Sequence, residues 1–231
     1  MHNNVFNSSI LTAMDVSVGA RQPHHLNGLV RLFHAPYEHN GYPVEGPPDW
    51  KAPESWLQFF AGSATSSEIL GLVACQGDEE SDAQHPDGSS DNVNNGDGRE
   101  DGGMVEGDEG RVLGHVSLRR VSRGSIVFQI WCDITGNRNA EDELWEVCRF
   151  AVDPAVQGKG LGGMLLGAVE SKGQREEKPL FLGVLEKDVA AIRMYDKRGW
   201  IKAGQDKMVG RDGRVWVEYF YKYPAKQRHD K

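Results

Sequence analysis

The sequence is poor in the features that mark several large classes of protein. Its three cysteines, Cys75, Cys132 and Cys148, are far apart and form no C-x-x-C pair, so we expect neither a disulfide framework nor a zinc site. Its eight histidines show no H-E-x-x-H spacing. No apolar run approaches the roughly 18–20 residues of a membrane helix, and residues 1–14 lack the regions of a secretory signal. We therefore expect a reduced, soluble, cytoplasmic protein that uses no metal, with a nuclear location left open.

The sequence also lacks two common catalytic turns and a strong positive charge. Neither a G-x-S-x-G nucleophile turn nor a G-x-x-x-x-G-K-[ST] phosphate loop is present. Lys and Arg number 26 against 34 Asp and Glu, and residues 78–109 alone contribute −11. The remaining 199 residues carry a net charge of +3, which is compatible with an anionic ligand and too small to indicate nucleic-acid binding.

Residues 78–109 consist mainly of Asp, Glu, Gly, Asn and Ser and contain no aromatic residue. Such a segment buries too little apolar area to offset its ordering entropy, so we expect a long disordered acidic insert. The apolar segments on either side, 68–75 and 111–118, have strand character. The insert is therefore expected to be an enlarged loop between two paired strands, because the cost of loop closure grows only logarithmically with length.

Hydrophobic periodicity predicts a single mixed α/β domain over residues 13–223, with flexible ends at 1–12 and 224–231. The expected order is a meander of strands, then one βαβ unit, then a closing hairpin. Strands are expected at 15–20, 68–75, 111–118, 125–132, 143–154, 179–186, 200–205 and 214–223, and helices at 23–35, 53–61, 161–172 and 188–199. In the last helix, Asp188 is the expected N-cap and Gly199 the terminator.

The glycine-rich stretch 157–163, which reads QGKGLGG, is the most informative part of the chain. It follows a strand and begins a helix, where unpaired N–H groups and the helix dipole favour an anion. Further glycines within this helix weaken it by roughly 2–3 kcal/mol relative to alanine, so we expect a closely packed ligand or neighbour there. The same residues satisfy the dinucleotide fingerprint G-x-G-x-x-G. However, five residues separate the strand from the turn, and too little chain follows for a doubly wound sheet.

Residues 143–221 resemble the GCN5-related N-acetyltransferases. The match consists of the strand ELWEVCRFAVDP at 143–154, the turn Gln157-x-x-Gly160-x-Gly162, and the segment VLEKDVAAIRMYDKRGW at 184–200. This last segment is similar to the family pattern V-x-x-x-N-x-x-A-x-x-x-Y-x-x-x-G-F. The resemblance implies a central, mostly antiparallel twisted sheet with one parallel βαβ unit and helices on both faces.

The resemblance also implies acetyl-CoA as co-substrate and direct transfer of its acetyl group to a primary amine. The N–H groups from Gln157 to Gly162 would hold the pyrophosphate, with the charge of Lys159 added. Phe150 and Val152 would offer main-chain hydrogen bonds to the pantetheine arm, and the Val152 amide would stabilise the oxyanion. The implied cofactor-binding residues are Phe150, Val152, Gln157, Gly158, Lys159, Gly160, Leu161, Gly162, Asp188 and Tyr195.

Acetyl transfer to an alkyl amine needs a base, because an ammonium with a pKa near 10.4 is only about 0.04% neutral at pH 7. Glu146 is our candidate. If the strand alternates regularly, Leu144, Glu146, Cys148, Phe150 and Val152 share one face, and Glu146 is a carboxylate on an otherwise apolar surface. It also matches the place of a catalytic glutamate in some family members. The alternative is a structural ion pair with Arg149 or another arginine, and a bulge would change the alternation.

Tyr195 matches the family tyrosine that lies near the CoA sulfur as general acid. The alternative is a core tyrosine whose hydroxyl is bonded elsewhere. Asp188 replaces the usual asparagine. Its side chain is able to cap the helix, whereas a carboxylate beside an anionic ligand puts the usual contact in question.

The acceptor is expected to be a primary amine of a small molecule or a protein. Its contacts are sought among Tyr37, Glu38, His39, Tyr42, Trp50, Trp131, Trp145, Trp216 and Tyr219, although most such aromatic residues simply pack. We expect a monomer or homodimer without nucleic-acid or membrane partners. A CoA-binding sensor or scaffold module without turnover is the alternative function.

Overall fold

A computed structural model describes residues 16–40, 47, 49, 51–62, 68–76, 111–138, 144–210 and 213–223, without the side chains of 35–40, 62, 68–72 and 76. The elements are β1 Val16–Ala20, α1 Leu26–Asn40, α2 Pro53–Gly62, β2 Glu68–Gln76, β3 Val112–Arg120, α3 Ile126–Thr135, β4 Trp145–Val152, α4 Leu161–Arg175, β5 Leu180–Leu185, α5 Val189–Lys197, β6 Ile201–Val209 and β7 Val215–Tyr223, with 3-10 turns at Pro23–His25 and Pro154–Val156. The predicted acidic insert and flexible ends lie outside the described residues.

Seven strands form one sheet in the order β1-β2-β3-β4-β5-β7-β6. All neighbours are antiparallel except β4 and β5, which are parallel and joined through α4. This confirms the predicted mixed α/β fold with a mostly antiparallel sheet and one βαβ unit. The pairing of β2 with β3 also confirms that residues 77–111 connect two paired strands.

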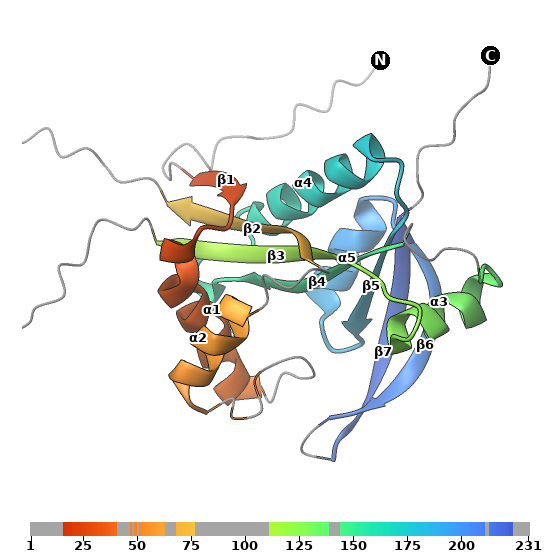
Figure 1. Cartoon of the computed structure of the whole chain (residues 1–231), viewed down its shortest axis with the longest axis horizontal. Helices are drawn as coiled ribbons and strands as arrows, with labels where there is room; N and C mark the ends of the chain where they lie inside the picture. Colours follow the sequence, from red (N-terminus) through yellow and green to blue (C-terminus); the bar gives the residue numbers. More distant parts are fainter. Residues whose placement is uncertain are drawn as a thin grey trace, which may run out of the picture.

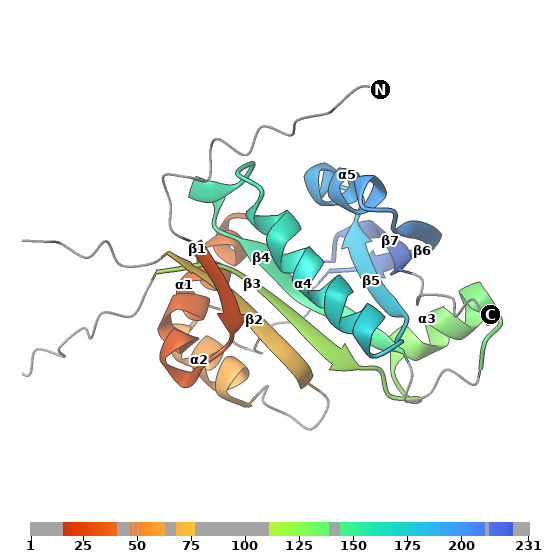
Figure 2. The ribbon, with the colours of Figure 1, turned by 90° about the horizontal axis from the view of Figure 1, so that it is seen from above.

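Helices cover both faces of the sheet (Figures 1 and 2). We call them the α4–α5 face and the α1–α3 face, after the helices that pack on each. Strand alternation directs one set of apolar side chains to each face. The α4–α5 face holds the largest core, which includes Leu118, Val147, Leu165, Leu182 and Tyr195. The α1–α3 face holds two smaller cores, around Trp56 and Phe60 of α2 and around Phe128 and Trp131 of α3.

The strand expected at 125–132 is wrong, because these residues form helix α3. The Ser125 side chain caps the helix by accepting a hydrogen bond from the Phe128 amide at 3.1 Å. Phe128, Trp131 and Cys132 are buried, whereas Ile126 is 72% exposed. That spacing fits a helical period of 3.6 residues, and packing against β5 and β7 outweighs the strand preference of the β-branched and aromatic residues.

Proline and glycine end two further elements close to the expected places. β4 spans Trp145–Val152, within the predicted 143–154, and a 3-10 turn begins at Pro154. α5 is followed by Gly199, whose φ of 81° is the left-handed conformation of a helix terminator, and the Trp200 amide donates to the Tyr195 carbonyl at 3.1 Å. Asp188 is the N-cap residue as predicted, but its side chain makes no capping hydrogen bond.

Candidate functional site

β4 and β5 are parallel neighbours that separate after two residue pairs. Trp145 pairs with Leu180 and Glu146 with Phe181, and no later pair follows. β4 nevertheless continues along β3 to Val152, and β5 continues along β7 to Leu185. The sheet therefore contains an internal gap whose two sides are strand edges. Such an edge offers main-chain donors and acceptors to an extended ligand, which binds as an added strand does.

A β-bulge in β4 changes the expected alternation of its side chains. His115 and Ser117 are two residues apart on β3, but their partners on β4, Ala151 and Cys148, are three residues apart. β4 therefore contains one extra residue at this point, which is a β-bulge. Arg149, within the bulge, has a φ of 50°. Regular alternation would place Phe150 and Val152 on the same face as Glu146. Instead, both pack against the core of the α4–α5 face. The prediction that positions 144–152 share one face at every even residue is therefore wrong beyond 148.

After the bulge, the main chain of Val152 points into the gap between β4 and β5. The next amide, that of Asp153, donates to the Leu113 carbonyl of β3 at 2.8 Å. Because successive amides of a strand point to opposite sides, the Val152 amide faces away from β3 and toward β5. The amide of Phe150, two residues earlier, points to the same side as the Val152 amide. The Val152 carbonyl accepts a hydrogen bond from Gln157 Nε2 at 3.1 Å. This bond connects the end of β4 to the glycine-rich stretch 157–163, which we call the glycine turn.

The glycine turn presents a group of amides that lack acceptors. Within the described chain, no acceptor is found for the amides of Gly158, Gly160, Leu161, Gly162 or Gly163. The first helical bond of α4 is donated by Met164 to the Gly160 carbonyl at 3.1 Å. Gly158 and Gly160 have φ values of 78° and 89°, which glycine adopts without strain. Unpaired amides at the start of a 15-residue helix favour the binding of an anion.

Two of the predicted pyrophosphate ligands are already occupied. The Gln157 amide donates to the Pro154 carbonyl, and the Lys159 amide donates to the Val156 carbonyl, each at 3.4 Å. These bonds are long and therefore weak. The amides of Gly158, Gly160, Leu161 and Gly162 remain as the stronger candidates from the predicted set.

The glycines within α4 face α5 at close range. A Cβ at Gly162 would lie 3.3 Å from Met194 Sδ, and a Cβ at Gly167 would lie 3.0 Å from Arg198 Nη2. The expected close neighbour of these glycines is therefore helix α5 and the residue that follows it. The glycines lower the intrinsic stability of α4 and allow α5 to approach it.

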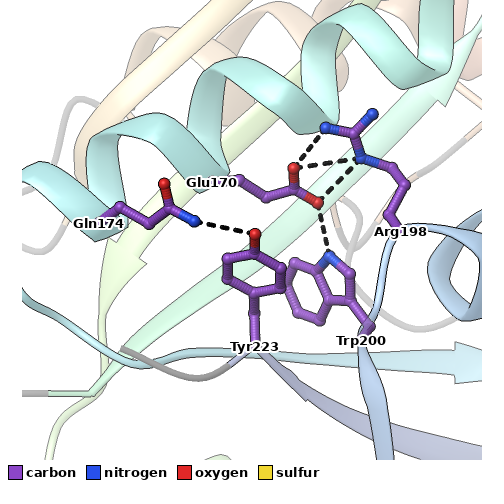
Figure 3. A network of polar contacts seen from close by, with 5 residues as sticks. All are labelled: Glu170, Gln174, Arg198, Trp200 and Tyr223. Atoms are coloured by element: carbon purple, nitrogen blue, oxygen red, sulfur yellow. Dashed lines mark hydrogen bonds and ion pairs between the residues drawn. The ribbon is translucent and has the colours of Figure 1, made fainter. Parts of the chain in front are cut away.

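A buried carboxylate joins α4 to the end of α5 (Figure 3). Glu170, whose side chain is 7% exposed, accepts from Arg198 Nε at 2.9 and 3.1 Å, and also from Arg198 Nη2. Trp200 Nε1 donates to the same carboxylate at 2.7 Å. Gln174, one turn further along α4, donates to the Tyr223 hydroxyl at 2.9 Å. The carboxylate thus has charged and neutral donors, which offset the cost of burying it.

Tyr195 lies on α5 in the core of the α4–α5 face. Its ring packs against Trp200 and Tyr221, with centroids 5.8 and 5.7 Å away. Burial raises the pKa of Tyr195 above its ordinary value, and the negative charge of Asp188 raises it further. The hydroxyl therefore stays protonated at neutral pH and is a hydrogen-bond donor.

Glu146 lies on the opposite face, at the point where β4 and β5 separate. Its neighbours Trp145 and Val147 pack into the core of the α4–α5 face, so Glu146 projects toward the α1–α3 face. Arg119 on β3, directly opposite in register, donates from Nε to Glu146 Oε2 at 2.6 Å. The ion pair considered as an alternative role is therefore present, with Arg119 as the arginine. Glu146 and Tyr195 thus lie on opposite faces of the sheet.

Two residues that sequence analysis missed lie beside this gap on the α1–α3 face. Gly183 is exposed, although every other residue of β5 is buried. A Cβ at this position would overlap the carboxylate of Glu218, which belongs to β7 and lies over the glycine. Gly183 is two residues beyond Phe181, the last partner of β4. No local signal in the sequence reveals this pair, because the two residues belong to separate strands and the register of β5 with β7 brings them together.

The aromatic acceptor candidates are scattered. Trp145 and Trp131 are buried in two different cores. Two cations lie near the Trp216 ring, with Lys187 Nζ at 4.7 Å and the Arg214 guanidinium at 5.5 Å from its centroid. Lys202 Nζ lies 3.1 Å from the ring centroid of Tyr219. Tyr42, Trp50 and the side chains of Tyr37, Glu38 and His39 lie outside the described residues.

The described residues contain neither a helix that could span a membrane nor a group of side chains that could hold a metal ion. None of the helices there combines the length and the apolar character needed to cross a bilayer. In the same ranges, no three His, Cys, Asp or Glu side chains converge in a way that would hold a metal ion.

The sequence of the chain matches the model of a known protein family. The model of the Acetyltransferase (GNAT) family matches residues 72–200, which is more than half of the chain. The chain therefore belongs to the GNAT acetyltransferase family, and acetyl transfer is the general activity that this membership supports. No curated protein matches the sequence.

Solved structures of acetyltransferases share the fold. An N-acetyltransferase from Staphylococcus aureus Mu50 is 15% identical, with a TM-score of 0.61 over 91% of this chain and 99% of that one. The putative acetyltransferase yncA from Salmonella typhimurium, solved with its cofactor acetyl-CoA, is 16% identical, with a TM-score of 0.58 over 94% and 97%. Arabidopsis thaliana NAA60, solved in complex with a bisubstrate analogue, is 15% identical, with a TM-score of 0.55 over 90% and 97%.

Proposed function

We propose that the chain is an acetyl-CoA-dependent N-acetyltransferase that transfers acetyl directly to a primary amine of a small molecule or a protein. The observation that carries this proposal is the gap between β4 and β5, together with the unpaired amides that follow β4. A pyrophosphate fits the amides of Gly158, Gly160, Leu161 and Gly162. An extended, amide-containing pantetheine arm fits the strand edge at Phe150 and Val152. The Salmonella structure with acetyl-CoA shows that the same fold holds this ligand.

Three groups of the chain have proposed chemical roles, and acetyl-CoA supplies the activated acetyl group as a thioester. The Val152 amide points into the gap and stabilises charge on the carbonyl oxygen during transfer. Glu146 accepts the proton that the amine loses as its nitrogen bonds to the acetyl carbon. Tyr195 faces the departing sulfur from the other face and donates to the thiolate as the carbon–sulfur bond breaks. Its raised pKa suits a hydrogen bond better than complete proton transfer to a thiolate of lower pKa.

Replacing Glu146 with glutamine is expected to lower kcat by about 10²–10⁴-fold, the range for loss of a general base. Replacing Tyr195 with phenylalanine removes one hydrogen bond to the sulfur, and the expected loss in kcat is about tenfold. Both variants should still bind CoA, because neither change removes a proposed pyrophosphate ligand. The measurements are thiol release from acetyl-CoA with a panel of amines and calorimetric titration with CoA.

The wild-type results separate the possibilities. Absence of CoA binding by the full chain would refute the proposal. Tight CoA binding without turnover of any amine would indicate a sensor or scaffold module instead. Full activity of Glu146→Gln would leave Glu146 with the structural ion pair to Arg119 as its role.

The acceptor is proposed to approach from the α1–α3 face, where Gly183 opens the sheet and Glu218 provides a carboxylate. Gly183→Ala is expected to displace the Glu218 side chain and raise the KM for an amine acceptor by about tenfold, with the KM for acetyl-CoA unchanged. Glu218→Gln should have the same selective effect. Gly19→Ala is the matched control, since this strand glycine has open space around its Cβ. Equal acceptor KM values for Gly183→Ala and the control would exclude this approach.

A further inference from the structure

His115 on β3 is a fully buried polar residue for which the proposed reaction has no direct use. Its Nδ1 lies 2.8 Å from the carbonyl oxygen of Arg149, and its Nε2 lies 3.5 Å from Ser117 Oγ. The rings of Phe33 from α1 and Phe60 from α2 contact it edge-on, with centroids 5.6 and 6.0 Å away. The imidazole is therefore held in one orientation by packing as well as by hydrogen bonding.

The carbonyl that His115 contacts belongs to the β4 bulge. Arg149 has a φ of 50°, a conformation that costs a non-glycine residue free energy, and it falls in the interrupted part of the β3–β4 ladder. An interrupted ladder leaves a main-chain group that needs another partner. A side chain from β3 supplies it here. The Arg149 guanidinium also lies over the Phe59 ring, 4.7 Å from its centroid, so both ends of this residue are anchored on the α1–α3 face.

The contacts define the tautomer of the imidazole. A carbonyl oxygen only accepts, so Nδ1 must carry the hydrogen. Nε2 is then the acceptor, and the Ser117 hydroxyl is its available donor. Burial lowers the pKa of His115 to about 3, so the ring is neutral at physiological pH and keeps this arrangement.

We propose that His115 is a positioning residue for acetyl transfer: its Nδ1–H holds the Arg149 carbonyl, fixes the β4 bulge and thereby aims the Val152 amide into the gap between β4 and β5. This inference rests on the proposed function. Phe150 and Val152 face the gap only because the bulge shifts the alternation of β4 by one residue. A bulge that relaxes would turn the oxyanion donor away, while the glycine turn that holds the pyrophosphate would keep its geometry.

Two substitutions distinguish this role from that of an ordinary core histidine. Asn Nδ2 is attached to Cγ as His Nδ1 is, so His115→Asn keeps a donor at the same place along the side chain. His115→Leu fills part of the same space and removes the donor. If His115 is a positioning residue, His115→Leu should lower kcat by about 10- to 100-fold, a smaller decrease than complete loss of an oxyanion donor would cause. The KM for acetyl-CoA should change by less than about threefold. His115→Asn should keep kcat within about threefold of wild type.

The kinetic comparison uses the full chain, with acetyl-CoA and an amine that the wild type acetylates, and the folded fraction of each variant is measured by urea unfolding. Equal losses of kcat in the Leu and Asn variants, or a loss that matches the unfolded fraction, would overturn the proposal. Wild-type protein that fails to bind CoA or to acetylate any amine would instead refute the proposed function.

A measurement on the wild-type protein needs no variant to fold. Long-range ¹H–¹⁵N correlation spectra of the full chain report which imidazole nitrogen carries the hydrogen. A neutral ring with the hydrogen on Nδ1 is expected at pH 7. A neutral ring with its hydrogen on Nε2 alone would contradict the hydrogen bond to Arg149 and the proposal with it.

Discussion

Replacing Arg198 with methionine is expected to lower the free energy of unfolding by about 3 kcal/mol, the lower end of the range for breaking a buried ion pair. The loss is large because Glu170 would remain buried as a charge, with the Trp200 N–H as its one remaining donor among the described residues. The lower end applies because the Arg198 side chain is 32% exposed. Urea unfolding followed by tryptophan fluorescence and circular dichroism measures the change, and a constant m-value would show that it reports stability.

An arginine in an exposed pair provides the matched control. Arg111 is bonded to Asp153 at 2.7 Å, and its side chain is 60% exposed, so Arg111→Met should cost less than about 1 kcal/mol. The double variant Glu170→Met, Arg198→Met should lose less stability than the sum of the two single variants, because it leaves no unpaired buried charge. Arg198→Met that costs no more than Arg111→Met would contradict this interpretation of the network.

Acid is expected to destabilise the fold through His115, and the effect should exceed that of most single substitutions. The pKa of this group falls from 6.5 to about 3 in the folded protein, mainly because of burial, while the hydrogen bond to Arg149 opposes the shift. The positive charges of Arg21 and Arg149 lower it further. Between these two values the unfolded chain binds a proton that the folded chain does not. This contribution to stability is therefore complete above about pH 6.5 and is lost as the pH falls, by about 1.4 kcal/mol per pH unit.

The measurement is the free energy of unfolding in urea at pH 7, 6, 5 and 4 for wild type and His115→Asn. Carboxylates titrate in both proteins, so the difference between the two curves isolates the histidine. Wild type should lose stability more steeply than the variant as the pH falls below 6.5. Parallel curves would mean that His115 takes up a proton without unfolding.

The elements that sequence analysis predicted well are those with strong local signals. Asp153-Pro154 ends β4, Gly160 precedes α4, and Gly199 ends α5, each through main-chain conformations that depend on one or two residues. The segment IVFQIWC carries a weaker signal, because its β-branched and aromatic residues fit a strand as well as a helix. Its state is decided by contacts with Phe181 and Phe220, which are distant in sequence.

The candidate site likewise contains residues that a local sequence signal predicts and residues that it does not. The amides of the glycine turn follow from a contiguous stretch and were predicted as a group. The β4 bulge, and with it the face of Phe150 and Val152, depends on how β3 and β4 pair. His115 with Arg149, Arg119 with Glu146, and Gly183 with Glu218 are each neighbours across strands. Strand register sets these pairs, and no single stretch of sequence encodes it.

The two residue pairs that join β4 to β5 have a consequence for how the molecule unfolds. Beyond these pairs the sheet separates into β1–β4 and β5–β7–β6, which are also connected by the shared core and by the contacts of α4 with α5 and Arg198. Without ligand, amide hydrogens in the two halves should exchange with separate opening free energies. A ligand seated along both free strand edges would contact both halves at once. The halves would then open as one cooperative unit, and the exchange rates of β4 and β5 would converge.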